Sequence, residues 1–181
     1  MESKEQIVYD FHCPRWTELP TLLLYMDQVV VIIDEALQAF PMQGEKTITP
    51  AMINNYVKAG LITPPVKKKY DRGHVAALIV ISLLKRVLSM NEVAGVLRVL
   101  RGECEQEEGY NLFCEKAEKA IDAKNHPFLE EKGGLKPAEN LLNAVMLALH
   151  GKVQVQYLLE EKEPGKKATE KKPAKEKQPK A

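Results

Sequence analysis

A glycine and a pair of prolines limit how the middle of this 181-residue chain can fold. Gly60 can end a helix in the left-handed backbone conformation, and Pro64 and Pro65 then prevent the helix from resuming. Upstream, Thr49 and Pro50 form the pattern of a helix start, in which a capping hydroxyl precedes proline at the first helical position. Between these limits, apolar residues recur at helical spacing: Met52, Ile53, Tyr56 and Val57. The sequence therefore predicts a short helix over residues 49–59.

The residues after the proline pair predict a short extended segment with a basic tip. Lys67, Lys68 and Lys69 form this tip, and Asp71 is placed to cap a further helix that begins near Arg72. A compact helix followed by a stiff basic loop is the layout of a winged helix, in which the helix enters a DNA groove and the wing contacts phosphate. The predicted fold class is therefore mainly α: a winged helix-turn-helix with a small β-hairpin wing, plus C-terminal helices.

The same residues resemble a known group of regulators. Residues 52–62, Pro64, Pro65 and Tyr70 look like the recognition helix and wing of MerR-type transcriptional regulators. When residues 22–28 and 88–93 are included, the chain is most similar to a bacterial family known only as a domain of unknown function, number eighteen thirty-six, over residues 18–100. The resemblance implies a MerR-like fold, duplex DNA as a partner and dimerisation through a long C-terminal helix.

Charge is distributed unevenly, although the net charge is only +1. Residues 1–45 carry two basic and eight acidic side chains, whereas residues 46–72 carry six basic and one acidic. Candidate DNA-contacting residues lie in this basic segment: Asn54, Asn55, Lys58, Lys67, Lys68, Lys69 and Arg72. Asparagine can pair with adenine through two hydrogen bonds, and lysine or arginine can contact guanine or phosphate. The alternative for these residues is an ordinary solvated helix face and turn.

Periodicity predicts five further helices. The first, over residues 22–40, has an acidic outer face formed by Asp27, Asp34 and Glu35. The second, over residues 72–87, is apolar nearly all round and therefore belongs at the centre of the core. Ser89 and Glu92 form a capping-box pattern that starts the third, which closes at residue 102. The last two, over residues 110–124 and 137–160, follow an acidic linker and a glycine-containing loop.

These elements suggest three parts of the chain. Residues 1–102 form the predicted winged helix-turn-helix domain with an N-terminal arm, and residues 103–161 form a C-terminal helical region. The apolar seam of helix 137–160 can serve either dimerisation or packing within one chain. Residues 162–181 carry eight lysines and three glutamates without apolar anchors, which is typical of a disordered tail. Cys13, Cys104 and Cys114 are odd in number and irregularly spaced, as expected of reduced thiols in a cytoplasmic protein.

The sequence contains none of the familiar patterns for catalysis, cofactor binding or metal binding. It has no GxGxxG or GxxxxGK[ST] motif, and its four histidines and three cysteines do not show the spacing of metal ligands. The longest apolar runs, at residues 29–33 and 75–84, are too short to cross a bilayer. We therefore expect neither an enzyme nor a membrane protein, with no catalytic residue, cofactor or metal.

The favoured function is that of a cytoplasmic transcriptional regulator. It would bind double-stranded DNA as a homodimer joined by the C-terminal helices, and its small-molecule effector is unknown. The second hypothesis is a protein–protein interaction module on the same scaffold that has lost DNA binding, because MerR-type helices usually place arginine where Asn54 stands and glutamate where Val57 stands. A continuous positive surface favours DNA, whereas interruption by the acidic helix face favours a protein partner.

Overall fold

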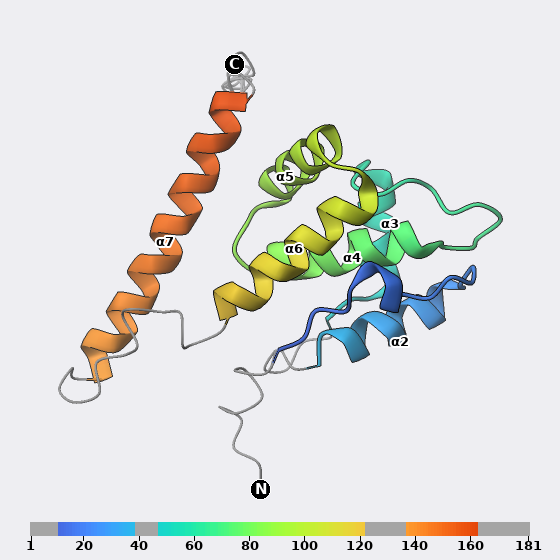
Figure 1. Cartoon of the computed structure of the whole chain (residues 1–181), viewed down its shortest axis with the longest axis horizontal. Helices are drawn as coiled ribbons and strands as arrows, with labels where there is room; N and C mark the ends of the chain where they lie inside the picture. Colours follow the sequence, from blue (N-terminus) through green and yellow to red (C-terminus); the bar gives the residue numbers. More distant parts are fainter. Residues whose placement is uncertain (1–10, 39–46, 122–136, 163–181) are drawn as a thin grey trace, which may run out of the picture.

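The computed structural model describes residues 11–38, 47–121 and 137–162. Within these ranges the protein is helical, as Figure 1 shows. The elements in chain order are a 3₁₀ turn η1 (Trp16–Glu18), α2 (Met26–Ala36), α3 (Pro50–Lys58), α4 (Arg72–Leu84), α5 (Met90–Glu103), α6 (Gln106–Ile121) and α7 (Pro137–Lys162). Several predicted segments lie outside the described residues: residues 1–10 at the N-terminus, the loops at 41–46 and 125–136, and the tail beyond residue 162.

Helix α4 is the centre of the core, as its apolar pattern predicts. Its side chains are buried on several faces, including Val75, Leu78, Ile79 and Ile81, and it packs against both α2 and α6. Burying a side chain of this size contributes about 1.5–3 kcal/mol, so these residues are a main source of stability. Tyr56 and Tyr70 are also buried in the core.

Three predicted helix starts are confirmed by their hydrogen bonds. The Thr49 hydroxyl accepts from the Met52 backbone N–H at 3.3 Å at the start of α3, with Pro50 as the first helical residue. The Asp71 carboxylate accepts from the His74 N–H at 3.0 Å and begins α4. Ser89 begins α5 with a capping box, in which its N–H donates to the carboxylate of Glu92 at 2.7 Å. These bonds satisfy backbone donors that a helix cannot pair internally.

The prediction of a β-hairpin wing is wrong. In residues 47–121 and the other described ranges there is no β-strand, only two isolated bridges, which join Leu24 to Tyr70 and Val66 to Lys69. Pro64 and Pro65 lack the N–H groups that a ladder on that side requires. Tyr70 instead exchanges two hydrogen bonds of 2.8 and 2.9 Å with Leu24, which lies before α2. The mainly α part of the predicted fold class is confirmed.

This pairing also explains why α2 is shorter than predicted. The expected helix begins at residue 22, but α2 begins at Met26 because the backbone of Leu24 is already bonded to Tyr70. The Gln28 side chain accepts the Tyr25 N–H at 2.9 Å and marks the start of the helix. Leu24 and Tyr25 therefore lie beside Tyr70 and Lys69 rather than within a helix.

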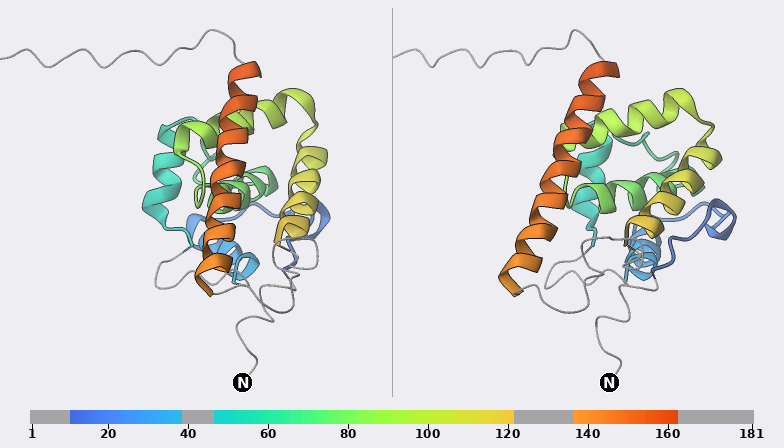
Figure 2. Two further views of the ribbon diagram at one scale, coloured as in Figure 1. Left: turned by 90° about the vertical axis from the view of Figure 1, so that its left-hand side faces the viewer. Right: turned by 60° about the vertical axis from the view of Figure 1, so that its left-hand side comes forward.

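The last two helices differ in how they join the body. Helix α6 begins at Gln106, within the segment predicted as a linker, and packs on α4, α5 and η1. Helix α7 contacts α5 and crosses it at a large angle at one side of the molecule, as the two views of Figure 2 show. At its contact with α5, Gly95 faces Leu159 so closely that an added Cβ would lie 3.0 Å from the leucine methyl carbons. Among the described residues, no helix has the length and apolarity to span a membrane.

Candidate nucleic-acid interface

Helix α3 has one buried and one exposed face. Ile53 and Tyr56 lie in the core and fix the orientation of the helix. On the opposite face Asn54, Asn55 and Lys58 are exposed. Residues three and four apart share a helix face, so both asparagines neighbour Lys58. Two amides and an ammonium group are thus presented together to solvent.

The helix ends in the way that the glycine predicts. Gly60 has a φ of +71°, in the left-handed region, and its N–H donates to the carbonyl of Val57 at 3.0 Å. The Leu61 N–H then donates to the carbonyl of Tyr56 at 2.9 Å, which completes a helix C-cap of the Schellman type. The buried Leu61 and Ile62 follow and anchor the start of the next loop in the core.

Residues 66–69 form a tight turn that we call the lysine turn. The Lys69 N–H donates to the Val66 carbonyl at 2.9 Å, and the two central residues, Lys67 and Lys68, have φ angles of 49° and 62°. Two positive φ angles are typical of a type I′ turn, for which asparagine and glycine are the favoured residues. Both lysines are exposed. The turn is therefore held in a strained backbone conformation while it presents two ammonium groups outward.

The structure separates the remaining two candidates from this tip. The ammonium group of Lys69 lies 5.3 Å from the centre of the Tyr25 ring, a cation–π contact at the side of the turn. The guanidinium of Arg72 lies 5.6 Å from the centre of the Trp16 ring and is partly buried at the start of α4. Lys67 and Lys68 thus stand at the tip, Lys69 borders it, and Arg72 is directed towards η1.

Charge in this region has one sign over a continuous stretch. Residues 47–70 contain four lysines and no acidic residue. The acidic face of α2 is only partly presented to solvent: Asp27 and Glu35 are exposed, whereas Asp34 is half-buried and its Oδ1 has no hydrogen-bond partner among the described residues. Asp27 lies in the first turn of α2, directly after the segment that borders the lysine turn. The positive surface of α3 and the turn therefore has an acidic neighbour on one side.

An apolar rim accompanies the lysine turn. Leu22, Leu23 and Tyr25 are 76%, 56% and 53% exposed, and Val66 is 72% exposed. The two bonds between Leu24 and Tyr70 and the contact of Lys69 with Tyr25 hold this end of residues 20–25 beside the turn. In the projection of Figure 1 both loops extend towards the right-hand side of the molecule. A protein exposes such a group of large apolar side chains where it meets a partner more often than by chance.

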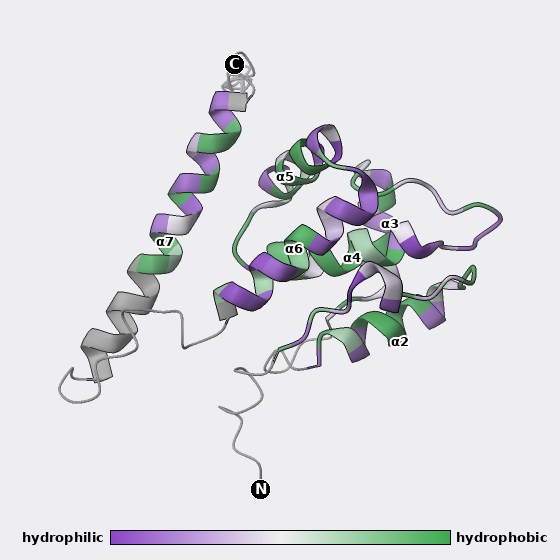
Figure 3. Cartoon of the chain, in the orientation of Figure 1, coloured by the Kyte–Doolittle hydropathy of each residue, from purple (hydrophilic) through white to green (hydrophobic). Residues whose placement is uncertain are grey.

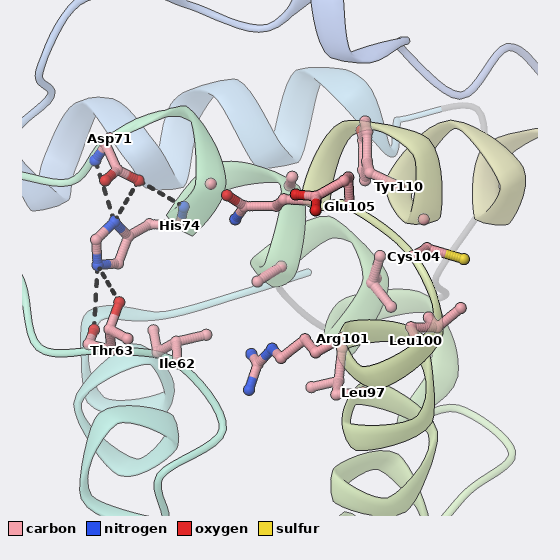
Figure 4. A pocket seen from close by; sticks show the side chains of 16 residues that line it. Ile62, Thr63, Asp71, His74, Leu97, Leu100, Arg101, Cys104, Glu105 and Tyr110 are labelled. Carbon is pink, nitrogen blue, oxygen red and sulfur yellow. Dashed lines mark hydrogen bonds and ion pairs between the residues drawn. The ribbon is translucent and has the colours of Figure 1, made fainter.

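A cavity of about 490 Å³ lies behind the α3–α4 connection. Figure 4 shows His74 between Asp71 and Thr63 at one wall, with Leu97 and Arg101 of α5 opposite. The His74 Nδ1 lies 2.7 Å from the carboxylate of Asp71, and its Nε2 lies 3.1 Å from both Thr63 oxygen atoms. The imidazole therefore links Thr63, near the start of the α3–α4 connection, to Asp71 at its end.

The charged side chains that line the cavity either form hydrogen bonds with the protein or face a group of the opposite charge. Partial burial resists ionisation of Asp71, but the N–H of His74 stabilises the carboxylate and lowers its pKa. Arg101 donates to the carbonyl of Leu61 at 2.6 Å. Glu105 places a second carboxylate in the lining. Because both charge signs meet there, the cavity favours no single class of charged ligand.

One contact has no counterpart in the sequence analysis. Cys13 and Cys114, which are 101 positions apart, are both fully buried, and their sulfur atoms lie 3.0 Å apart. Sequence spacing contains no signal for this pair, since only the packing of residues 11–19 on α6 brings the thiols together. Within the described residues, no group of three or more His, Cys, Asp or Glu side chains is arranged to hold a metal ion.

Comparison with known proteins gives the family but no relative of known function. No curated protein and no solved structure matches the chain. The family model matches residues 14–120, which include the exposed face of α3, the lysine turn and Cys114. Because it extends over residues 14–120, more than half of the sequence, the chain belongs to the family described as Domain of unknown function (DUF1836).

Proposed function

We propose that this protein is a cytoplasmic transcriptional regulator that binds duplex DNA, in the manner of the MerR-type proteins that its sequence resembles. Asn54, Asn55 and Lys58 of α3 would approach base edges in the major groove. Lys67 and Lys68 of the lysine turn would contact the phosphates beside it. The turn does this as a compact loop rather than as a hairpin.

The observation that carries this proposal is the backbone of the lysine turn, where two lysines adopt positive φ angles that lysine disfavours. Two consecutive non-glycine residues occupy the left-handed region, where each L-residue costs on the order of 1 kcal/mol. An asparagine–glycine pair would form the same turn more cheaply. Strain that is retained in an exposed turn supports a functional reason for the two ammonium groups, and phosphate is the ligand that they fit.

A homodimer joined through α7 is part of the proposal. Leu149, Val153 and Tyr157 are about half-exposed and are spaced four residues apart, so they form one line along the helix. The residues that face α5 are different ones, among them Lys152, Gln156 and Leu159. An apolar line that the described part of the chain leaves uncovered supports self-association. Figure 3 shows hydrophobic and hydrophilic positions alternating along this half of α7.

The test is a salt series of duplex DNA binding for the wild type and for a variant in which Lys67, Lys68 and Lys69 are changed to Glu. Each lost phosphate contact should reduce the slope of log K against log salt by about 0.9, so we expect the slope to fall by about 2 to 3. The affinity should fall by more than about tenfold at low salt, measured by fluorescence anisotropy. Equal binding of the two proteins at every salt concentration would end the DNA proposal.

A second variant separates loss of charge from loss of folding. Changing Lys67 to Asn and Lys68 to Gly should stabilise the protein by about 1 kcal/mol, because these residues suit positive φ angles. The same variant should bind DNA more weakly, since two ammonium groups are gone. Lys116 is exposed on α6, and Lys116→Glu serves as a matched charge reversal that should leave DNA binding unchanged.

The apolar rim favours a second candidate function, the recognition of a protein partner. Leu22, Leu23 and Val66 beside three lysines suit an acidic segment that also carries apolar residues. We expect a synthetic helix of alternating leucine and glutamate pairs to bind if this function is correct. Leu22→Ser with Leu23→Ser should weaken that binding and leave the DNA salt series unchanged. The opposite pattern favours DNA as the ligand.

A further inference from the structure

The contact between residues 11–19, which we call the arm, and α6 contains two thiols in the interior of the protein. Cys13 donates its S–H to the sulfur of Cys114, and Cys114 lies 3.7 Å from the carbonyl oxygen of Pro14. The same carbonyl accepts the hydroxyl of Tyr110 at 2.7 Å. Each sulfur is completely shielded from solvent. The two atoms need to approach by only about 1 Å to reach the length of a disulfide bond.

The surroundings distinguish the two thiols chemically. The hydrogen bond from Cys13 lowers the pKa of Cys114, although burial opposes this effect. The same hydrogen bond, together with burial, raises the pKa of Cys13. Arg15 places a guanidinium next to the pair and favours a negative sulfur, whereas Glu118 disfavours it. Cys114 is therefore the sulfur that more readily becomes a thiolate, which is the form that attacks an oxidant.

We propose that Cys13 and Cys114 are a redox pair that a hydroperoxide converts to an intramolecular disulfide. In the first step the Cys114 thiolate attacks one oxygen of hydrogen peroxide; an S–O bond forms, the O–O bond breaks, and the hydroxide that leaves takes up the proton lost by the thiol. In the second step the sulfur of Cys13 attacks the sulfenic acid; the S–S bond forms, the S–O bond breaks, and the released hydroxide takes the Cys13 proton. Two thiols and one peroxide thus become one disulfide and two waters.

The arm controls access of the oxidant to the thiols. It buries Phe11, Cys13 and Leu19, and its polar contacts with α6 are the Cys13 N–H to Glu118 at 2.8 Å, the paired bonds between Arg15 and Glu118, and the Trp16 N–H to Asn111 at 2.9 Å. Local opening of such a segment exposes buried groups without global unfolding. Oxidation should therefore be slow in the wild type and faster when the arm is loosened.

The resulting bond would join two distant parts of the fold. It links residue 13 to residue 114 and closes a loop that contains α2, α3, α4 and α5. A cross-link over a loop of this length restricts the unfolded chain strongly, and we expect the melting temperature to rise on the order of 10 °C on oxidation. This inference does not depend on the proposed DNA-binding function, because it rests on the thiol geometry alone.

The test uses the full-length protein and its three cysteines. After graded exposure to hydrogen peroxide, the remaining thiols are alkylated and the digested protein is analysed by mass spectrometry. We expect the Cys13 and Cys114 peptides to disappear together as one disulfide-linked species, with Cys104 still alkylated and with recovery after reduction. Cys104→Ser is the matched control and should form the same linked species at the same rate.

Two further variants make the result decisive. Glu118→Gln removes the carboxylate that holds the arm, so its oxidation should be several times faster than that of the wild type. Cys13→Ser should accumulate sulfenic or sulfinic acid at Cys114, because the resolving thiol is absent. The proposal is overturned if Cys104 enters the disulfide, if only intermolecular disulfides form, or if both buried thiols stay reduced in the native protein under peroxide that oxidises them after denaturation.

Discussion

The arm and α7 both dock on the helical body with contacts that include one carboxylate, yet they dock in different ways. Glu118 accepts bonds from the Cys13 N–H and from Arg15, and the arm buries Phe11, Cys13 and Leu19 around it. Glu92 accepts bonds from the Ser89 N–H and from Gln156, both at 2.7 Å, but the neighbouring stripe of α7 remains exposed. The arm has thus become part of the core, whereas α7 keeps an exposed apolar stripe.

The difference shows what a polar anchor alone can achieve. A carboxylate with several donors fixes the orientation of a segment, but its net contribution is limited by the cost of removing charge from water. The arm gains additional stability because apolar side chains are buried beside its anchor. Glu92, Lys152 and Gln156 orient α7, and none of its residues 147–161 is fully buried, so the proposed interface with a second copy would cover the exposed stripe.

The largest expected effect concerns the exposed stripe of α7. If this surface joins two copies, Val153→Asp should weaken the dimer by about 100-fold, because a charge must be buried without a partner. Sedimentation velocity over a concentration series measures this change. Gln154→Asp adds the same charge at the next exposed position, about 100° away around the helix, and should have little effect. A wild type that is monomeric at every concentration contradicts the dimer.

A smaller effect is expected at the arm. Glu118→Gln should destabilise the protein by about 2 kcal/mol, because Arg15 loses a charged partner in a half-buried position. Urea unfolding measures the change. Glu115→Gln on the same helix removes an exposed pair with Lys119 and should change stability little. If the two variants were equally stable, the arm would be no better integrated than a surface salt bridge.

The smallest effect is a dependence on pH at the α5–α7 contact. The Ser89 N–H stabilises the Glu92 carboxylate most, Gln156 and Lys152 add to this, and the pKa falls to about 2. Because the unfolded chain has a glutamate pKa of about 4.3, the stabilisation is present above that pH and is lost as the pH falls from about 5 to about 2. Unfolding free energies measured across this range should fall less steeply in Glu92→Gln. Parallel curves for the two proteins would show that the ionised carboxylate contributes nothing to stability.

Part of the candidate site follows from the sequence, and part could not have been foreseen. Thr49, Pro50 and Gly60 set the limits of α3 through local backbone chemistry, so the exposure of Asn54 and Lys58 was predictable from helical spacing alone. The lysines of the turn were identified, but the hairpin was not formed. A hairpin wing requires residues of the same loop to pair with each other, whereas Tyr70 pairs with Leu24, which is 46 positions away in the sequence. Arg72 belongs to the same basic segment yet contacts the ring of Trp16, because η1, which packs on α6, places that ring within reach.

The sequence by itself determined the helices, their capping residues and the central place of α4, because these depend on hydrogen bonds and on apolar periodicity within a few residues of one another. Only the tertiary structure decided that Cys13 meets Cys114, that the apolar rim lies beside the lysine turn and that α7 keeps an uncovered stripe. The physical reason is that periodicity reports which face of an element is buried, while the identity of the surface that buries it depends on how distant elements pack.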